Sequence, residues 1–139
     1  MLRFNIRVYA LIVNGNNEIL ISEERRHGIY FTKFPGGGLE WGEGITDCLK
    51  RELLEELGLP CEIGELFFVN DFFQASAFSK DDQLFSFYFK IKWIEHQKIK
   101  VVNHDTPIRE DEERFRWISL DSISPNIFTF PIDKNVASN

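Results

Sequence analysis

Apolar and polar side chains alternate with a period of two over several segments near the N-terminus, which is the pattern of β-strands. The segment 4–13 is apolar on both faces in its second half, so we expect a strand that is covered on both sides. A turn is predicted at 14–17 and a returning strand at 18–22. A charged loop is expected at 23–28, and a short aromatic strand at 29–34.

One segment has a helical period instead. Isoleucine and leucine recur every four residues between 43 and 57, with no proline and no glycine after Gly44. Gly58 suits the left-handed position that ends a helix, and Pro60 prevents the helix from resuming. We therefore predict one strong helix in the first half of the chain.

Further strands are expected beyond this helix. A bulged strand is predicted within 62–77, and the most regular alternation lies at 84–94, where the phenylalanine-bearing face should be core and the other face partly wet. A long polar loop follows at 95–113, then a last strand at 115–120 and a short helix after Pro131. This order favours an α/β domain in which a mixed sheet carries a helix on at least one face.

Composition narrows the function classes. The chain has 139 residues, which suits a single domain over 1–139, and a net charge of −6 makes non-specific nucleic-acid or membrane binding unfavourable. Its two cysteines are too few for a disulfide framework and lack zinc-site spacing. No targeting or membrane-spanning segment is apparent, so we expect a cytoplasmic protein with no membrane partner.

The predicted helix carries three carboxylates on one face. Glu52, Glu55 and Glu56 fall within an arc of about 100°, and a like-charge pair at i,i+4 costs roughly 0.2–0.5 kcal/mol. The last helical turn also opposes anions by roughly 0.3–1 kcal/mol. Magnesium prefers oxygen ligands and would relieve both penalties, whereas a solvated acidic face is the competing interpretation. A glycine-rich loop, predicted at 36–38 before the helix, lets backbone approach a ligand closely and favours the metal site.

These residues form a longer pattern that resembles the signature of a known family. Its fixed positions are all matched, and the whole resembles the box of the Nudix (MutT-like) hydrolases: Gly37, Glu43, Arg51-Glu52-Leu53, Glu55-Glu56 and Gly58-Leu59. The resemblance implies a Nudix fold, an α/β/α sandwich with a mixed β-sheet and one prominent catalytic helix. It also implies a pyrophosphohydrolase that cleaves a nucleoside diphosphate linked to another moiety by attack of water on phosphorus.

The resemblance also implies roles for individual residues. Two or more Mg²⁺ ions, with Mn²⁺ as a substitute, would be held by Glu52, Glu55, Glu56 and the carbonyl of Gly37. Glu43 and Arg51 would brace the loop against the helix. Glu40 matches the loop glutamate of the family and is a candidate substrate contact.

Candidates outside the box are less sharply defined. A further ligand or general base is expected within 110–113, with Asp111 or Glu112 preferred, and a solvated loop is the alternative. His104 is a weaker candidate base. Contacts to phosphate or ribose are expected from a basic set that precedes the box, with plain solvent exposure as the alternative: Arg25, Arg26 and Lys33.

The sequence leaves the substrate, the oligomeric state and the type of activity open. The substrate could be a nucleotide sugar, ADP-ribose or a nucleoside triphosphate, and a homodimer is compatible with the sequence. A catalytically silent nucleotide-binding sensor is the main alternative to a hydrolase. An isomerase acting on an isoprenyl diphosphate would need a catalytic cysteine, whereas Cys48 falls within the helix and Cys61 follows it.

Overall fold

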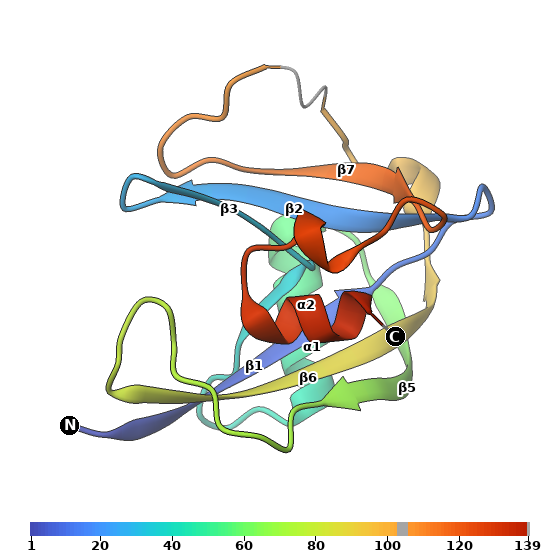
Figure 1. Cartoon of the computed structure of the whole chain (residues 1–139). Helices are drawn as coiled ribbons and strands as arrows, with labels where there is room; N and C mark the ends of the chain where they lie inside the picture. The colour runs from blue at the N-terminus through green and yellow to red at the C-terminus, as the bar shows by residue number, and fades with distance from the viewer. Residues whose placement is uncertain (103–105, 139) are drawn as a thin grey trace. The chain divides into compact units, whose positions relative to one another are not determined.

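The computed structural model describes residues 1–102 and 106–138. They form two compact units, each with its own sheet: the first combines Met1–Leu11 with Gly36–Glu95, and the second combines Ile12–Pro35 with the chain from His96 onward (Figure 1). Among the described residues, no helix is long and apolar enough to cross a bilayer.

The first unit is built on a mixed four-stranded sheet. Its strand order is β4 (Gly36–Gly38), β1 (Arg3–Leu11), β6 (Asp82–Ile94) and β5 (Cys61–Val69). Strands β1 and β6 are parallel and the other pairings are antiparallel, which confirms the predicted mixed sheet. Helix α1 (Ile45–Leu57) packs against β1, β4 and β5.

Apolar packing and helix-end chemistry explain why α1 lies where the sequence predicts it. Leu49 and Leu53 are fully buried on its inner face. At the N-terminus the amide of Gly44 donates to the carboxylate of Asp47 at 3.2 Å. At the C-terminus Gly58 adopts φ 71° and its amide donates to the carbonyl of Leu54, as predicted for a glycine that ends a helix.

The second unit holds an antiparallel sheet in the order β3 (Ile29–Lys33), β2 (Glu18–Arg26) and β7 (Glu113–Ser119). Two 3₁₀ turns, η1 (His96–Lys98) and η2 (Pro125–Ile127), and helix α2 (Pro131–Ala137) complete it. The segment before α2 runs beside β3, where the amide of Thr129 donates to the carbonyl of Thr32 at 3.2 Å and the rings of Phe34 and Phe128 stack. The strand expected at 115–120 and the helix expected after Pro131 are confirmed.

Two predictions about local structure were wrong. The charged segment 23–28 is not a loop, because β2 continues to Arg26 and only His27 and Gly28 turn the chain. Buried ion pairs hold Glu23 and Glu24 in that strand, which a reading of apolar periodicity cannot detect. The glycine run is also not a loop, since 36–38 forms the short strand β4 beside β1.

The more buried face of β6 was also assigned wrongly. Ser86 and Tyr88 are buried, whereas the phenylalanine-bearing face of this strand is half-buried. Tyr88 stacks on Tyr9 with ring centroids 5.1 Å apart, and the side-chain oxygen of Asn70 accepts a hydrogen bond from the amide of Ser86. A hydroxyl-bearing face is therefore compatible with burial once its polar groups have partners. Strand β5 has the predicted bulges but ends at Val69.

Candidate functional site

The candidate site in the first unit begins with the backbone of β4. A Cβ atom on Gly36 would lie 2.1 Å from the carbonyl oxygen of Val8, so only glycine fits against β1. A Cβ atom on Gly37 would lie 2.5–2.6 Å from the carboxyl atoms of Glu52. The absence of a side chain at Gly37 therefore lets a helix carboxylate rest directly against the strand backbone.

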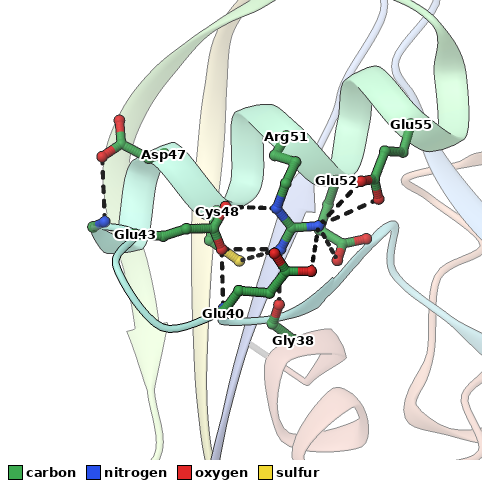
Figure 2. Close-up of polar contacts among 9 residues, drawn as sticks. Gly38, Glu40, Glu43, Asp47, Cys48, Arg51, Glu52 and Glu55 are labelled. Carbon is green, nitrogen blue, oxygen red and sulfur yellow. Dashed lines mark hydrogen bonds and ion pairs between the residues drawn. The ribbon is translucent and has the colours of Figure 1, made fainter.

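Arg51 connects the loop, the strand and the helix (Figure 2). Its Nε and Nη2 donate to the two carboxylate oxygens of Glu43 at 2.5 and 2.9 Å, which is a bidentate pair. Its Nη2 also donates to the carbonyl oxygen of Gly38 at 3.0 Å. The predicted bracing of Glu43 by Arg51 is thus present in the geometry, with the β4 backbone as an additional partner.

The remaining guanidinium nitrogen of Arg51 faces further carboxylates. Nη1 donates to Glu52 at 3.0 Å and to Glu55 at 3.3 Å, and it lies 3.7 Å from Glu40. One cation is thus shared by four carboxylates when Glu43 is included, which leaves a local charge of +1 − 4 = −3. Such a surplus of negative charge attracts cations to this face of α1.

The ionisation of two glutamates follows from these contacts. The hydrogen bonds from Arg51 and from the Glu40 backbone lower the pKa of Glu43 from 4.5 to about 2. Burial instead raises the pKa of Glu52, and the neighbouring Glu55 adds to the increase while Arg51 opposes it. A positive charge placed beside these residues would therefore stabilise the ionised form of Glu52 more than that of Glu43.

Glu56 lies one residue beyond this group and contacts a different part of β4. Its Oε2 accepts a hydrogen bond from the amide of Gly36 at 3.2 Å. This contact ties the last turn of α1 to the strand. Glu56 therefore contacts β4 at Gly36, next to Gly37, where the carboxyl group of Glu52 rests.

A tight turn precedes the helix and is braced by the same residues. The amide of Glu43 donates to the carbonyl of Glu40 at 3.2 Å, and the amide of Glu40 donates to the carboxylate of Glu43 at 3.0 Å. Gly42 has φ 93°, which an L-residue rarely adopts, and Trp41 is fully exposed at the tip. Glu40 is consequently held by its backbone, while its side chain is largely exposed.

A further contact was missed at the level of sequence. Cys48 is buried one helical turn before Arg51, with its Sγ 3.9 Å from Nη2, and it is hydrogen-bonded to Glu43. Burial raises the pKa of its thiol to about 11. The i,i+3 spacing of Cys48 and Arg51 on the predicted helix would have placed them on neighbouring surface and was the available signal.

The donor set can be tested for its fit to a divalent cation. Within 1–102 and 106–138, no three acidic, histidine or cysteine side chains converge closely enough to form a ready-made metal cluster. Arg51 draws Glu52 and Glu55 toward itself, and Glu56 bonds to Gly36. All available donors are oxygens, and the carboxyl group of Glu52 lies against the backbone of Gly37. The chemistry of these donors therefore fits a hard cation such as Mg²⁺.

The acidic segment predicted to supply a further carboxylate lies in the second unit. The amide of Asp111, which adopts φ 63°, donates to the carbonyl of Arg25 at 2.7 Å, and the amide of Arg25 donates to the carbonyl of Glu112 at 3.1 Å. Asp111 and Glu112 are thus fixed beside the end of β2 by their backbone. Their roles stay predictions, and His104 lies outside the described residues.

The three basic candidates also lie in the second unit, and each is paired with a carboxylate. Arg25 Nε lies 3.5 Å from Glu110, and Arg26 donates to Glu24. Lys33 is buried, with its Nζ 3.3 Å from Glu113. Substrate contacts from Arg25, Arg26 and Lys33 stay predictions, and for Lys33 the present geometry also supplies a structural partner.

Comparison with known proteins assigns the family. The family description that matches is the NUDIX domain, over residues 3–137. The chain belongs to the Nudix family. Hydrolases of this family generally need a divalent metal ion such as Mg²⁺.

Individual relatives of this Nudix protein agree with that assignment. The RNA pyrophosphohydrolase of Roseobacter denitrificans is 32% identical over 59 residues, which is 42% of this chain and 37% of the relative. The 8-oxo-dGDP phosphatase NUDT18 of Mus musculus is 38% identical over 56 residues, which is 40% of this chain and 17% of the relative. The matches therefore span well under two thirds of the length of these relatives.

A solved structure supports the fold of the Nudix chain over its length. The MutT Nudix hydrolase from Burkholderia pseudomallei superposes with a TM-score of 0.73 at 20% identity, covering 98% of this chain and 97% of that one. At this level of identity the similarity concerns the fold. The predicted fold class, a mixed α/β Nudix fold with one prominent helix, is confirmed.

Proposed function

We propose that this Nudix protein is a metal-dependent hydrolase of nucleoside diphosphate derivatives and that residues 1–139 act as one hydrolase domain. The observation that carries the proposal is the arrangement around Gly37, where the carboxyl group of Glu52 rests on the backbone of β4 beside a face of net negative charge. The names of the two relatives, an RNA pyrophosphohydrolase and an 8-oxo-dGDP phosphatase, support a phosphorus–oxygen bond in a nucleotide as the target.

Glu52, Glu55, Glu56 and the carbonyl of Gly37 would hold Mg²⁺, or Mn²⁺ in its place. When bound, such an ion screens the phosphate charges and lowers the pKa of a water molecule. The protein's own contribution is positioning. Arg51 fixes Glu52 and Glu55 on one side of the helix, and Glu43 fixes Arg51.

This positioning is independent of pH over the working range of most hydrolases. Because the pKa of Glu43 is about 2, its carboxylate stays ionised at neutral pH and the bidentate pair with Arg51 persists. We assign the general base to Asp111 or Glu112, whose loop is fastened to Arg25 by two backbone hydrogen bonds. Glu40, Arg25, Arg26 and Lys33 are the proposed substrate contacts.

A substrate panel with product identification tests the proposal. The protein is incubated with nucleoside triphosphates including oxidised forms, nucleotide sugars, ADP-ribose and a 5′-triphosphorylated RNA oligonucleotide, each with Mg²⁺ or Mn²⁺. We expect hydrolysis of the P–O–P linkage in one of these substrate classes. Nucleotide binding without any product across the panel would instead identify a catalytically silent sensor.

A matched pair of variants tests the assignment of Glu56. Glu56→Gln removes a charge but keeps an oxygen that can accept from the amide of Gly36, and circular dichroism without metal checks that the variant folds. Turnover should fall about 100-fold or more, as expected when a metal ligand is lost. Glu62→Gln, an equal change at an exposed glutamate of β5, is the control and should retain turnover. Near-wild-type turnover in Glu56→Gln would refute the assignment.

A further inference from the structure

A second cluster of buried charges lies in the second unit, on one face of the sheet formed by β3, β2 and β7. Glu23 is at its centre, opposite Thr32 on β3 and Arg114 on β7. Arg116 lies two residues further along β7 and so shares this face. The side chain of Glu23 is only 4% exposed, and burying a carboxylate so fully is costly unless it is paired.

Glu23 is paired with two arginines and a tyrosine. Arg116 Nε lies 3.2 Å from its Oε2, and Arg114 Nε lies 3.5 Å from its Oε1. The hydroxyl of Tyr30 donates to Oε2 as well. Two guanidinium groups therefore face one carboxylate. Arg25, on the same face, is paired with Glu110, which lies 3.5 Å from its Nε.

Arg116 is the member of the cluster whose terminal nitrogens have no hydrogen-bond acceptor within the described residues. Within the described residues, the only ion pair of its side chain joins Nε to Glu23, and neither of its Nη groups has a hydrogen-bond acceptor there. The side chain is 25% exposed. Its guanidinium is therefore oriented by a buried partner while its terminal edge is left for another group. Arg114, by contrast, also donates to the carbonyl of Thr106.

We propose that Arg116, oriented by Glu23 and flanked by Tyr30, is a binding site for a phosphate group. The terminal edge of a guanidinium matches two oxygens of a phosphate, and a side chain already held in place loses less entropy on binding. Tyr30 and Arg116 share the same oxygen of Glu23, so the half-exposed phenol ring borders the site. The site uses no residue of the acidic helix and goes beyond the proposed hydrolysis.

Binding measured without divalent metal tests this site separately from hydrolysis. Inorganic phosphate, AMP and adenosine are titrated into the chelator-resin-treated full chain by calorimetry, with sodium chloride at matched ionic strength. Phosphate and AMP should bind and adenosine should not. Tighter binding of AMP than of inorganic phosphate identifies a nucleotide phosphate as the ligand, whereas equal binding identifies free phosphate.

Substitutions then locate the site. Arg116→Gln should weaken the Kd for phosphate about 10-fold or more, because it removes a charge-assisted bidentate contact. Arg116→Lys keeps the charge but not the planar fork and should give an intermediate Kd. Arg109→Gln removes the same charge from an 88% exposed side chain of this unit and should not change the Kd.

Several results would overturn the proposal. The first is equal phosphate affinity in Arg116→Gln and wild type, and the second is adenosine binding as tight as AMP binding. The third is no phosphate binding at about 50 mM, where a single weak anion contact should be detectable.

Glu23 keeps Arg114 and Tyr30 as partners in Arg116→Gln, so the variant should fold, and circular dichroism checks this. Because no metal is present, failure here leaves the hydrolase proposal untouched, and the absence of any product on the substrate panel leaves this one untouched.

Discussion

Replacing Gly37 with alanine would place a methyl group in the space now taken by the Glu52 carboxylate. The added Cβ would meet three atoms of that carboxylate at 2.5–2.6 Å, whereas ordinary contact begins at 3.4 Å. The carboxylate must therefore retreat by about 1 Å. Gly37 does not have a positive φ, so alanine can adopt its backbone conformation and the side chain of Glu52 is what moves.

The magnitude follows from what Glu52 gives up. A side chain pushed off its rotamer costs about 0.5–1.5 kcal/mol. The hydrogen bond from Arg51 at 3.0 Å is lost or lengthened as well, and a bond of this kind contributes about 1 kcal/mol at a partly exposed site. The free energy of unfolding should fall by about 1–3 kcal/mol. Turnover should fall more steeply, about 100-fold, because a 1 Å displacement of a positioned group can have that effect.

Denaturant unfolding and steady-state turnover on the best substrate of the panel measure the two effects separately. Gly15→Ala is the control, because a Cβ there meets no atom within 4 Å and the backbone is not left-handed, so both quantities should stay near wild type. Wild-type turnover in Gly37→Ala would refute the idea that Glu52 must lie against this backbone. A global loss of folding would refute the claim that only a side chain has to move.

Three further predictions concern Arg51 and its surroundings. Arg51→Lys cannot form the bidentate pair with Glu43, so the Tm should fall by about 3–6 °C together with turnover, and an unchanged Tm by calorimetry would contradict the bracing role. The contribution of Glu43 to the free energy of unfolding should be complete above about pH 4.5 and be lost as the pH falls toward 2, because the carboxylate of Glu43 is protonated in the unfolded chain before it is protonated in the folded one. In Glu43→Gln the decline of Tm across this pH window should be shallower. Cys48, which is buried with a pKa of about 11, should resist iodoacetamide at pH 8 in the folded protein and react after denaturation, whereas the partly exposed Cys61 should react first; mass spectrometry of the two peptides decides this.

Residues that obey a local rule could be predicted from the sequence. Helix α1 begins and ends close to the expected positions because its leucine period and Gly58 are both encoded within a few residues. The pairing of Arg51 with Glu43 was likewise anticipated from spacing and family resemblance, and it is found in the geometry. The regular alternation of β6 predicted a strand correctly, although not which face is buried.

The errors arose where distant residues decide the outcome. Glu23 and Glu24 extend β2 because Arg114 on β7 and Lys33 on β3 neutralise them, and Arg114 is remote in sequence. Ser86 is buried because Asn70 supplies its amide with an acceptor. The acidic segment around Asp111 could be named but not placed, since its position depends on backbone contacts to Arg25 rather than on its own composition.

Two adjacent glycines of β4 exclude side chains for different reasons, and this difference constrains how the protein can evolve. At Gly36 the obstacle is a carbonyl of the neighbouring strand, which no exchange of side chains elsewhere can remove. At Gly37 the obstacle is the end of a glutamate, which a shorter residue at position 52 would withdraw. In a saturation library, suppressor mutations at position 52 should therefore restore stability and turnover to variants of the second glycine, whereas no side-chain change should rescue variants of the first.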